Sequence, residues 1–305
     1  MSLGSKNPPV LGAACWVLGA LVLGAVVPGA LVPGAPVPGA LVSSTQHPAP
    51  STQHRSGPLR VCADPNNLPY SNARQEGFEN AIASLVAREL GQAIDYVWQP
   101  QRRGFVRTTL KAGRCDVVMG VPAGYELVDT TQPYYTSAYV FVSRHDRHLG
   151  LRSFDDARLR RLVVGIQITG DDYNNPPPAR ALAARHLVNH VRGFPVYGDY
   201  SDAAPQKAVV DAVADGRVDT AVVWGPLAGY FASRAAVPLD LAPVTPAVDR
   251  FAVPFAFDMS MGVAKANDAL RSRLNSVIAH HGQEIRAILR RYGVPLVPRM
   301  GMSRS

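Results

Sequence analysis

The stretch from Leu59 to Glu79 constrains the fold of this 305-residue chain more than any other segment. Residues 59–63 are a short apolar-rich run that predicts a strand, and the polar and proline-containing residues 64–69 predict a turn. From Phe78 the apolar residues follow a helical period up to Gly91, where a helix would end. Strand, polar turn and helix open an α/β sheet, whose ligands bind beyond the carboxyl ends of the strands. The topology therefore places four residues at a binding face: Asp64, Asn66, Asn67 and Tyr70.

The net charge of +8 comes from 31 basic and 23 acidic side chains. The basic residues are scattered, with no run longer than two, whereas nucleic-acid binding needs clustered charge. The composition therefore argues against a nucleic-acid partner. It predicts an ordinary solvated surface with some attraction for acidic partners.

The N-terminal residues 1–42 do not look like part of the fold. Lys6 is the one charged residue among them, and the apolar stretch 10–27 resembles an export signal. The Val-Pro-Gly-Ala repeat that follows is too broken by Pro and Gly for a spanning helix. We therefore expect a signal peptide with a low-complexity segment over 1–42, a flexible linker over 43–57 and a periplasmic mature protein. A retained anchor is the alternative.

The remainder predicts two lobes built on similar α/β units. Gly113-Arg114-Cys115-Asp116 and Gly216-Arg217-Val218-Asp219 each follow a helical stretch and precede a Val-rich strand. A Gly/Pro turn ending in Ala-Gly-Tyr follows each strand, at Tyr125 and at Tyr230. We predict a two-lobe, type II periplasmic binding protein-like α/β fold, in which each lobe presents one of these turns to a shared cleft. The expected lobes, with crossings near 139–143 and 251–257, are 58–142 plus 250–298 and 143–249.

Five strings in the chain resemble one family of binding proteins. The strings are Cys-Ala-Asp-Pro-Asn-Asn-Leu-Pro-Tyr-Ser-Asn, Pro-Gln-Arg-Arg-Gly-Phe-Val-Arg, Cys-Asp-Val-Val-Met-Gly-Val-Pro-Ala-Gly-Tyr, Arg-Gly-Phe-Pro-Val-Tyr-Gly-Asp-Tyr and Val-Val-Trp-Gly-Pro-Leu-Ala-Gly-Tyr. Together they resemble the MoxJ/XoxJ-type periplasmic binding proteins. The resemblance implies an association with PQQ-dependent methanol or alcohol dehydrogenases.

The predicted cleft lacks the charged residues that hold an amino acid. Binders of this fold usually carry an arginine after the third strand, but residues 123–127 contain no basic residue. The acid expected after the strand 218–223 is replaced by Trp224-Gly225. The remaining candidates for ligand or partner binding are mostly aromatic or basic: Arg102, Arg103, Phe105, Pro122, Tyr125, Tyr134, Tyr135, Trp224 and Tyr230.

A turn of the second lobe adds polar candidates. Thr169, Asp171 and Asp172 lie where binders of this fold cradle an anion, and two carboxylates would spoil such a cradle. They could instead hold a cation together with Asp64, or simply build a turn. We predict no metal and no cofactor.

The two cysteines beyond the leader, Cys62 and Cys115, invite a disulfide in an oxidising compartment. In neighbouring parallel strands, however, one would lie near a strand end and the other near a strand start. The extended-chain rise of about 3.3 Å per residue would then separate them too far to bridge. We therefore expect two buried thiols.

Three functions remain open after the residues and the resemblance are combined. The leading prediction is a non-enzymatic periplasmic binding protein of a PQQ-dependent methanol dehydrogenase system, which contacts the dehydrogenase through its cleft. The alternative is a receptor that delivers a small non-amino-acid solute to an ABC permease. A dehydratase using carboxylates of the cleft ranks last, because no acid–base pair stands out.

Overall fold

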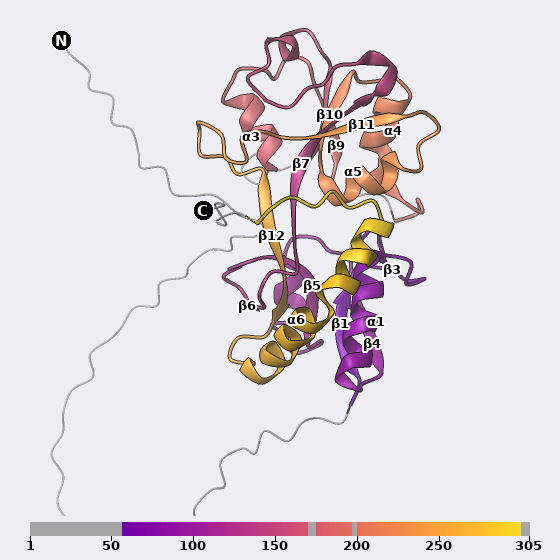
Figure 1. The fold of residues 1–305 in the computed structure, drawn as a ribbon, viewed down its shortest axis with the longest axis vertical. Coiled ribbons are helices and arrows are strands. Elements are labelled where there is room, and N and C mark those ends of the chain that lie inside the picture. Colours follow the sequence, from indigo (N-terminus) through magenta and orange to yellow (C-terminus); the bar gives the residue numbers. More distant parts are fainter. Residues whose placement is uncertain (1–56, 170–174, 197–199, 300–305) are drawn as a thin grey trace, which may run out of the picture.

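The computed structural model describes residues 57–169, 175–196 and 200–299. The predictions for the leader, for nearly all of the linker and for Asp171 and Asp172 lie outside these residues. Within them, no helix is both long and apolar enough to cross a membrane. The described chain forms two α/β lobes joined by two long strands, β7 (Tyr135–Arg144) and β12 (Ala256–Val263) (Figure 1).

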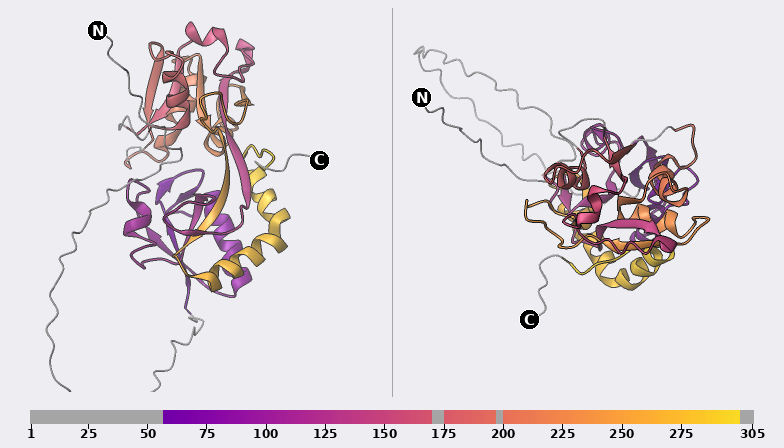
Figure 2. Two further views of the ribbon diagram at one scale, coloured as in Figure 1. Left: turned by 90° about the vertical axis from the view of Figure 1, so that its left-hand side faces the viewer. Right: turned by 90° about the horizontal axis from the view of Figure 1, so that it is seen from above.

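The first lobe is built on β1, which pairs in parallel with β4 on one side and β5 on the other. Helix α1 ends as predicted, because Gly91 adopts the left-handed conformation (φ 65°). Helix α6 bends at His281 and lies against α1 (Figure 2). The elements of this lobe are β1 (Leu59–Ala63), β2 (Asn66–Asn67), β3 (Ser71–Asn72), α1 (Phe78–Leu90), β4 (Ile94–Trp98), α2 (Phe105–Thr108), β5 (Val117–Pro122), β6 (Asp129–Thr130) and α6 (Asp268–Arg291).

The second lobe repeats this plan with a parallel run of strands. Strand β10 pairs in parallel with β8, which pairs in parallel with β9, and β7 closes the other side of β10 in antiparallel orientation. The elements of this lobe are three short 3₁₀ turns (His145–Arg147, Ala157–Arg160 and Pro205–Lys207), β8 (Val164–Ile168), α3 (Pro177–Ala183), β9 (Val191–Pro195), α4 (Ala208–Ala214), β10 (Thr220–Trp224), α5 (Gly225–Ala232) and β11 (Leu239–Pro243).

The two crossing strands belong to both lobes. Strand β12 pairs with β5 in the first lobe and with the start of β7, while the later part of β7 pairs with β10 and β11 in the second lobe. The strand order is therefore continuous from one lobe to the other, β4-β1-β5-β12-β7-β10-β8-β9. The two hinge crossings that the sequence predicts are confirmed.

The two similar strings, at 113–116 and 216–219, occupy equivalent positions in the two lobes. Asp116 donates its backbone N–H to Arg60 O (2.8 Å) and accepts the Arg60 N–H on its carboxylate (3.0 Å). Asp219 makes the same two bonds with Val163, at 2.9 and 2.8 Å. In both lobes an aspartate at the start of one strand thus fixes the start of its neighbour, because it supplies the two bonds that begin the ladder.

Two of the predicted element boundaries are wrong. The helix expected to run to Gly113 ends at Thr108, and a turn continues to Gly113. The Gly/Pro turn expected after Trp224 is a helix instead, because α5 begins at Gly225 with Pro226 in its first turn. Gly229 in this helix lies so close to the chain after α6 that an added Cβ would stand 1.9 Å from Gly293 O. This contact holds α5 of the second lobe against the end of the first.

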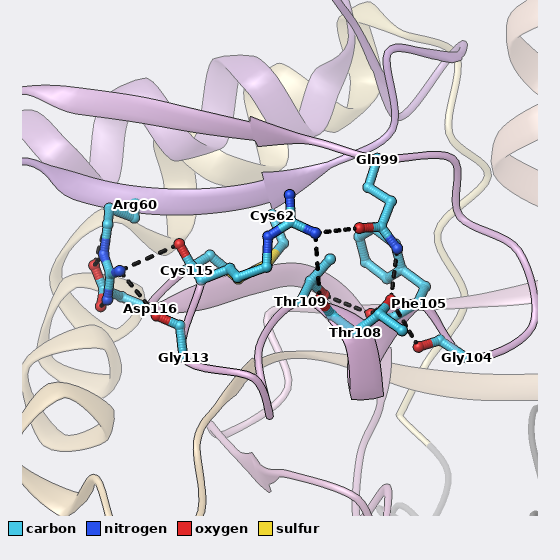
Figure 3. The surroundings of a disulfide bond; sticks show 11 residues. Arg60, Cys62, Gln99, Gly104, Phe105, Thr108, Thr109, Gly113, Cys115 and Asp116 are labelled. Atoms are coloured by element: carbon cyan, nitrogen blue, oxygen red, sulfur yellow. Dashed lines mark hydrogen bonds and ion pairs between the residues drawn. A yellow bond between two sulfur atoms is a disulfide. The ribbon is translucent and has the colours of Figure 1, made fainter.

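The prediction of two free thiols is also wrong, because Cys62 and Cys115 form a disulfide with a Cα–Cα distance of 5.6 Å (Figure 3). The strand register is close to the expected one, since Cys62 pairs with Val118. Cys115, however, precedes β5 and lies in the turn, so the rise of an extended strand does not apply to it. Both cysteines are buried with Phe105 and Leu110 on the sheet face that α2 covers.

The disulfide closes a 53-residue loop and should stabilise the first lobe by about 3 kcal/mol, since it limits the unfolded chain. We expect reductant to lower the urea midpoint of the wild type. The double variant Cys62→Ala/Cys115→Ala should unfold at the reduced midpoint and be insensitive to reductant. A wild-type midpoint that does not move on complete reduction would contradict this expectation.

Candidate functional site

The carboxylate of Asp64, at the carboxyl end of β1, lies at the junction of the lobes. The residue is 3% exposed. One carboxylate oxygen accepts the N–H of Asn66 (2.8 Å), and the other accepts the N–H of Gln101 (2.5 Å) and the hydroxyl of Tyr200 (2.6 Å). Tyr200 follows β9 and belongs to the second lobe. The predicted ligand-binding aspartate therefore joins the lobes.

The hairpin of β2 and β3 extends this junction. The Asn66 side chain donates to Asp202 O (2.6 Å), and Gln206 donates to Asn66 O (3.1 Å). Leu68, at the hairpin tip, is 7% exposed and packs with the apolar core of the second lobe. We call these contacts the lobe latch, formed by Asp64, Asn66 and Leu68 on one side and Tyr200, Asp202 and Gln206 on the other.

A hollow of about 320 Å³ lies beside the latch and is lined from both lobes. Asn66, Asn72 and Arg74 line one side, and Tyr200 and Asp202 line the other. Asn67 donates to Gln101 (3.1 Å), and the guanidinium of Arg102 lies 5.3 Å from the centre of the Tyr200 ring. The predicted residues Asp64, Asn66, Asn67 and Arg102 are thus brought together at one mouth of the cleft.

Other predicted site residues are placed elsewhere. Phe105 is buried beside the disulfide (Figure 3), and Tyr125 is half-buried against the same cluster. Tyr230 lies on α5 and stacks on Tyr292 of the first lobe, with ring centres 6.0 Å apart. Arg103 is exposed beside Arg102, and Pro122 and Thr169 are half-buried at the ends of β5 and β8.

Trp224 lies at the hinge. Its ring centre is 5.3 Å from that of Tyr139 on β7 and 5.7 Å from that of Phe257 on β12. It therefore packs on both crossing strands and supports their geometry. Replacing Trp224 would therefore disturb the packing of the hinge strands directly, whatever its effect on a bound partner.

Glu79 is a further candidate site residue that was not among those predicted from the sequence. Glu79 opens α1, and its carboxylate lies against Gly120 of β5, where an added Cβ would stand 2.2 Å from Oε1. Among the described residues, no side chain or backbone N–H donates a hydrogen bond to this carboxylate. Burial, and then the charge of Asp64, raise the pKa of Glu79 to about 8. The Gly-Phe-Glu string at the start of a helix is the signal that could have drawn attention to it.

Three tyrosines lie within electrostatic reach of one another or of Glu79. Burial is the main cause that raises the pKa of Tyr70 and Tyr135 well above its usual range. The negative charge of Glu79 adds to both shifts, and Tyr139 contributes to that of Tyr70. Glu79, Tyr70, Tyr135 and Tyr139 thus form one electrostatic group where the first lobe meets the hinge strand β7. Tyr134 lies beside it, but its hydroxyl donates to Met119 O (2.8 Å).

The described part of the chain offers no cluster suited to metal binding. It contains no group of three or more His, Cys, Asp or Glu residues that could hold an ion. Asp64, which the sequence analysis considered as a cation ligand, already accepts three hydrogen bonds. What the geometry offers is a closed mouth between two hinged lobes, with a hollow beside it that is lined by polar residues of both.

This architecture is that of a type II periplasmic binding protein, and the sequence comparison agrees. The chain belongs to the bacterial extracellular solute-binding proteins, family 3, whose model matches residues 59–295.

Individual relatives carry the comparison further. The chain is 32% identical to protein MoxJ of Methylorubrum extorquens over 262 residues. This match covers 84% of this chain and 87% of MoxJ. It is similar in structure to MxaJ from Methlophaga aminisulfidivorans (TM-score 0.67, 27% identity, 78% of this chain and 100% of the other). It is also similar to the periplasmic binding protein XoxJ from Methylobacterium extorquens (TM-score 0.65, 35% identity, 79% and 100%). The predicted MoxJ/XoxJ-type resemblance is confirmed.

The lobe latch leads to a testable prediction. Tyr200→Phe removes one donor from the buried Asp64 carboxylate, which should destabilise the closed arrangement by about 1–3 kcal/mol. We expect a lower urea midpoint and a larger radius of gyration by small-angle X-ray scattering. Tyr230→Phe is the matched control, since its hydroxyl makes no hydrogen bond among the described residues. Wild-type values for both quantities in Tyr200→Phe would show that the latch does not hold the lobes.

The raised pKa of Glu79 leads to another prediction. Because its folded-state pKa is raised, the folded protein is favoured while the group is neutral. This stability is present below the unfolded pKa of 4.5 and is lost as the pH rises toward about 8. Glu79→Gln should therefore gain stability over the wild type with rising pH, by on the order of 2 kcal/mol at pH 8, since partial exposure screens some of the cost. Urea unfolding at pH 5 and pH 8 measures this, and a pH-independent difference would refute it.

Proposed function

We propose that this protein is a non-enzymatic periplasmic binding protein that serves a PQQ-dependent methanol or alcohol dehydrogenase. The observation that carries the proposal is the similarity to MoxJ, MxaJ and XoxJ proteins over most of the chain. The resemblance of the five sequence strings to this family supplies the link to the dehydrogenase. Export follows the same reasoning, because the family is one of extracellular proteins.

The structure favours this proposal over the alternative that the protein is an amino-acid receptor. Residues 123–127, after β5, carry no basic side chain to pair with a ligand carboxylate. Trp224, where an acid is expected, packs on the hinge strands. A zwitterion placed in this cleft would leave its carboxylate without a partner, at a cost of several kcal/mol.

A basic segment beside the latch supports a protein partner. Residues 99–114 contain five basic and no acidic residues, and all five basic side chains are exposed. They are Arg102, Arg103, Arg107, Lys111 and Arg114. The segment begins beside Tyr200, where Arg102 lies over the ring, and then runs over the disulfide core, so it joins the mouth of the cleft. Such a patch attracts an acidic protein surface and speeds encounter with it. We place the dehydrogenase contact here.

Charge reversal tests this contact. Arg102→Glu/Arg107→Glu should weaken capture of the purified dehydrogenase from the same source at least about tenfold and reduce its salt dependence. Surface plasmon resonance at two ionic strengths measures both quantities.

Arg290→Glu, an exposed arginine of α6, is the control with the same change of charge per site. Unchanged affinity in the double variant would remove the basic segment from the contact. A wild-type protein that fails to bind the dehydrogenase at all would refute the proposed function and favour the small-solute receptor.

A further inference from the structure

The strand β4 is an open edge of the sheet, because it pairs with β1 and with no other described strand. At one end of this pair Leu59 donates its N–H to Ala93 O (2.7 Å), and at the other end Gln99 donates to Ala63 O (3.0 Å). Residues 93, 95, 97 and 99 therefore bond to β1, as in any parallel ladder. The N–H and C=O groups of the alternate residues point away from the sheet, and none of them has a hydrogen-bond partner in the described part of the chain. These residues are Ile94, Tyr96 and Trp98.

The two other edge strands of this length, β9 and β11, are protected against pairing. On β9 the residue Pro195 faces outward, and the outward N–H of Val191 is already donated to Val188 O (3.2 Å). On β11 the outward-facing residues include Pro243. Proline has no N–H to offer to an added strand, and natural edge strands carry it for that reason. Strand β4 has no proline, so its whole edge remains able to pair.

The side chains of β4 form a half-buried aromatic surface next to α1. The rings of Tyr96 and Trp98 are stacked, with centres 4.5 Å apart and planes at 16°. Ile94 packs on the same apolar core as Tyr96. Asp95 is the one charged residue in the stretch 92–100, and it lies opposite Arg60 of β1, whose pKa it helps to raise. The charge that would normally discourage pairing at an edge is thus compensated within the sheet.

The exposed edge of β4 is complementary to a second copy of itself. An antiparallel copy centred on Tyr96 places the two Tyr96 residues opposite each other and each Ile94 opposite a Trp98. These are all hydrogen-bonded pairs, so the three free N–H and three free C=O groups of each strand are satisfied together. Asp95 then lies opposite Val97 and not opposite another carboxylate, and the aromatic rings of both copies lie on one face. The arrangement has a two-fold axis and is complete with two copies.

We propose that β4 is a dimerisation edge, through which two copies of this protein join their first-lobe sheets in antiparallel orientation about Tyr96. The occupant is a second copy because the free backbone groups, the aromatic face and the single carboxylate all match under one two-fold axis. The dehydrogenase takes no part in this contact, so the dimer and the proposed function can fail separately.

Salt should affect the dimer in the opposite direction from capture of the dehydrogenase. The chain has a net charge of +8, so two copies repel each other at long range. Salt screens that repulsion, and dimerisation should therefore strengthen as the ionic strength rises. Capture of an acidic partner by the basic segment should weaken under the same change.

Sedimentation velocity of the purified exported protein, over a range of concentrations and at two ionic strengths, tests for the dimer. We expect a monomer–dimer equilibrium with a dissociation constant on the order of 10 µM, because one strand pair buries a small area. Tyr96→Pro removes an N–H that points away from β1, so no bond within the lobe is lost. It should weaken dimerisation at least about tenfold.

Cysteine cross-linking tests the register. In the Tyr96→Cys variant the two new cysteines form a directly opposed pair, with Cα atoms about 5.5 Å apart, which is within disulfide range. We expect a covalent dimer on mild oxidation. Ala93→Cys, at an exposed position just before β4, is the matched control, since its two copies would lie about 20 Å apart and should not cross-link.

Circular dichroism establishes that each variant is folded, and the cross-linking pair decides alone if Tyr96→Pro is not. A monomer at every concentration and at both ionic strengths would overturn the proposal. A dimer that a folded Tyr96→Pro variant forms equally well would also overturn it. So would cross-linking through Ala93→Cys as readily as through Tyr96→Cys.

Discussion

The arrangement of the two lobes depends on one buried carboxylate, that of Asp64. A carboxyl group at 3% exposure is tolerated only when its oxygens are satisfied, and here the three donors come from the residues that must meet to close the mouth. Two donors belong to the first lobe and the third, Tyr200, to the second. Opening the cleft by separating the lobes at this point would leave the charge with one donor fewer, so the carboxylate favours the closed form. Leu68, inserted into the core of the second lobe, adds an apolar contribution to the same preference.

The hinge side of the molecule restricts the lobes in a different way. The crossing strands β7 and β12 pair with each other, and Trp224 packs on both of them. Behind them, α5 approaches the chain after α6 so closely that neither Gly229 nor Gly293 has room for a side chain. The lobes are therefore held by polar contacts at the front and by close packing at the rear, and only the polar contacts can be exchanged for a ligand or a partner at low cost.

The aspartate and the glutamate of the cleft illustrate how environment separates two carboxyl groups. Asp64 accepts hydrogen bonds from two backbone N–H groups and one hydroxyl, and so serves as a structural acceptor between the lobes. Glu79 has no donor among the described residues, and burial shifts its pKa toward neutrality. A group with such a pKa gains and loses its proton near pH 8. Asp64, which the topology indicated, thus has its oxygens bonded by the protein's own donors. Glu79 has no such donor among the described residues.

The sequence by itself determined the local elements and the plan of the molecule. The helical period from Phe78 to Gly91, the paired Asp116 and Asp219, and the missing amino-acid clamp after β5 and β10 are all local features, and local features follow from propensity, capping and turn chemistry. What only the tertiary structure decided is which residues meet. The sequence shows that Phe105, Tyr135 and Trp224 are aromatic, but the residues they contact depend on segments far apart in the chain. Cys62 and Cys115 are the clearest case. Their bond depends on a turn that leaves the extended path just before β5, and a rise per residue carries no information about such a turn.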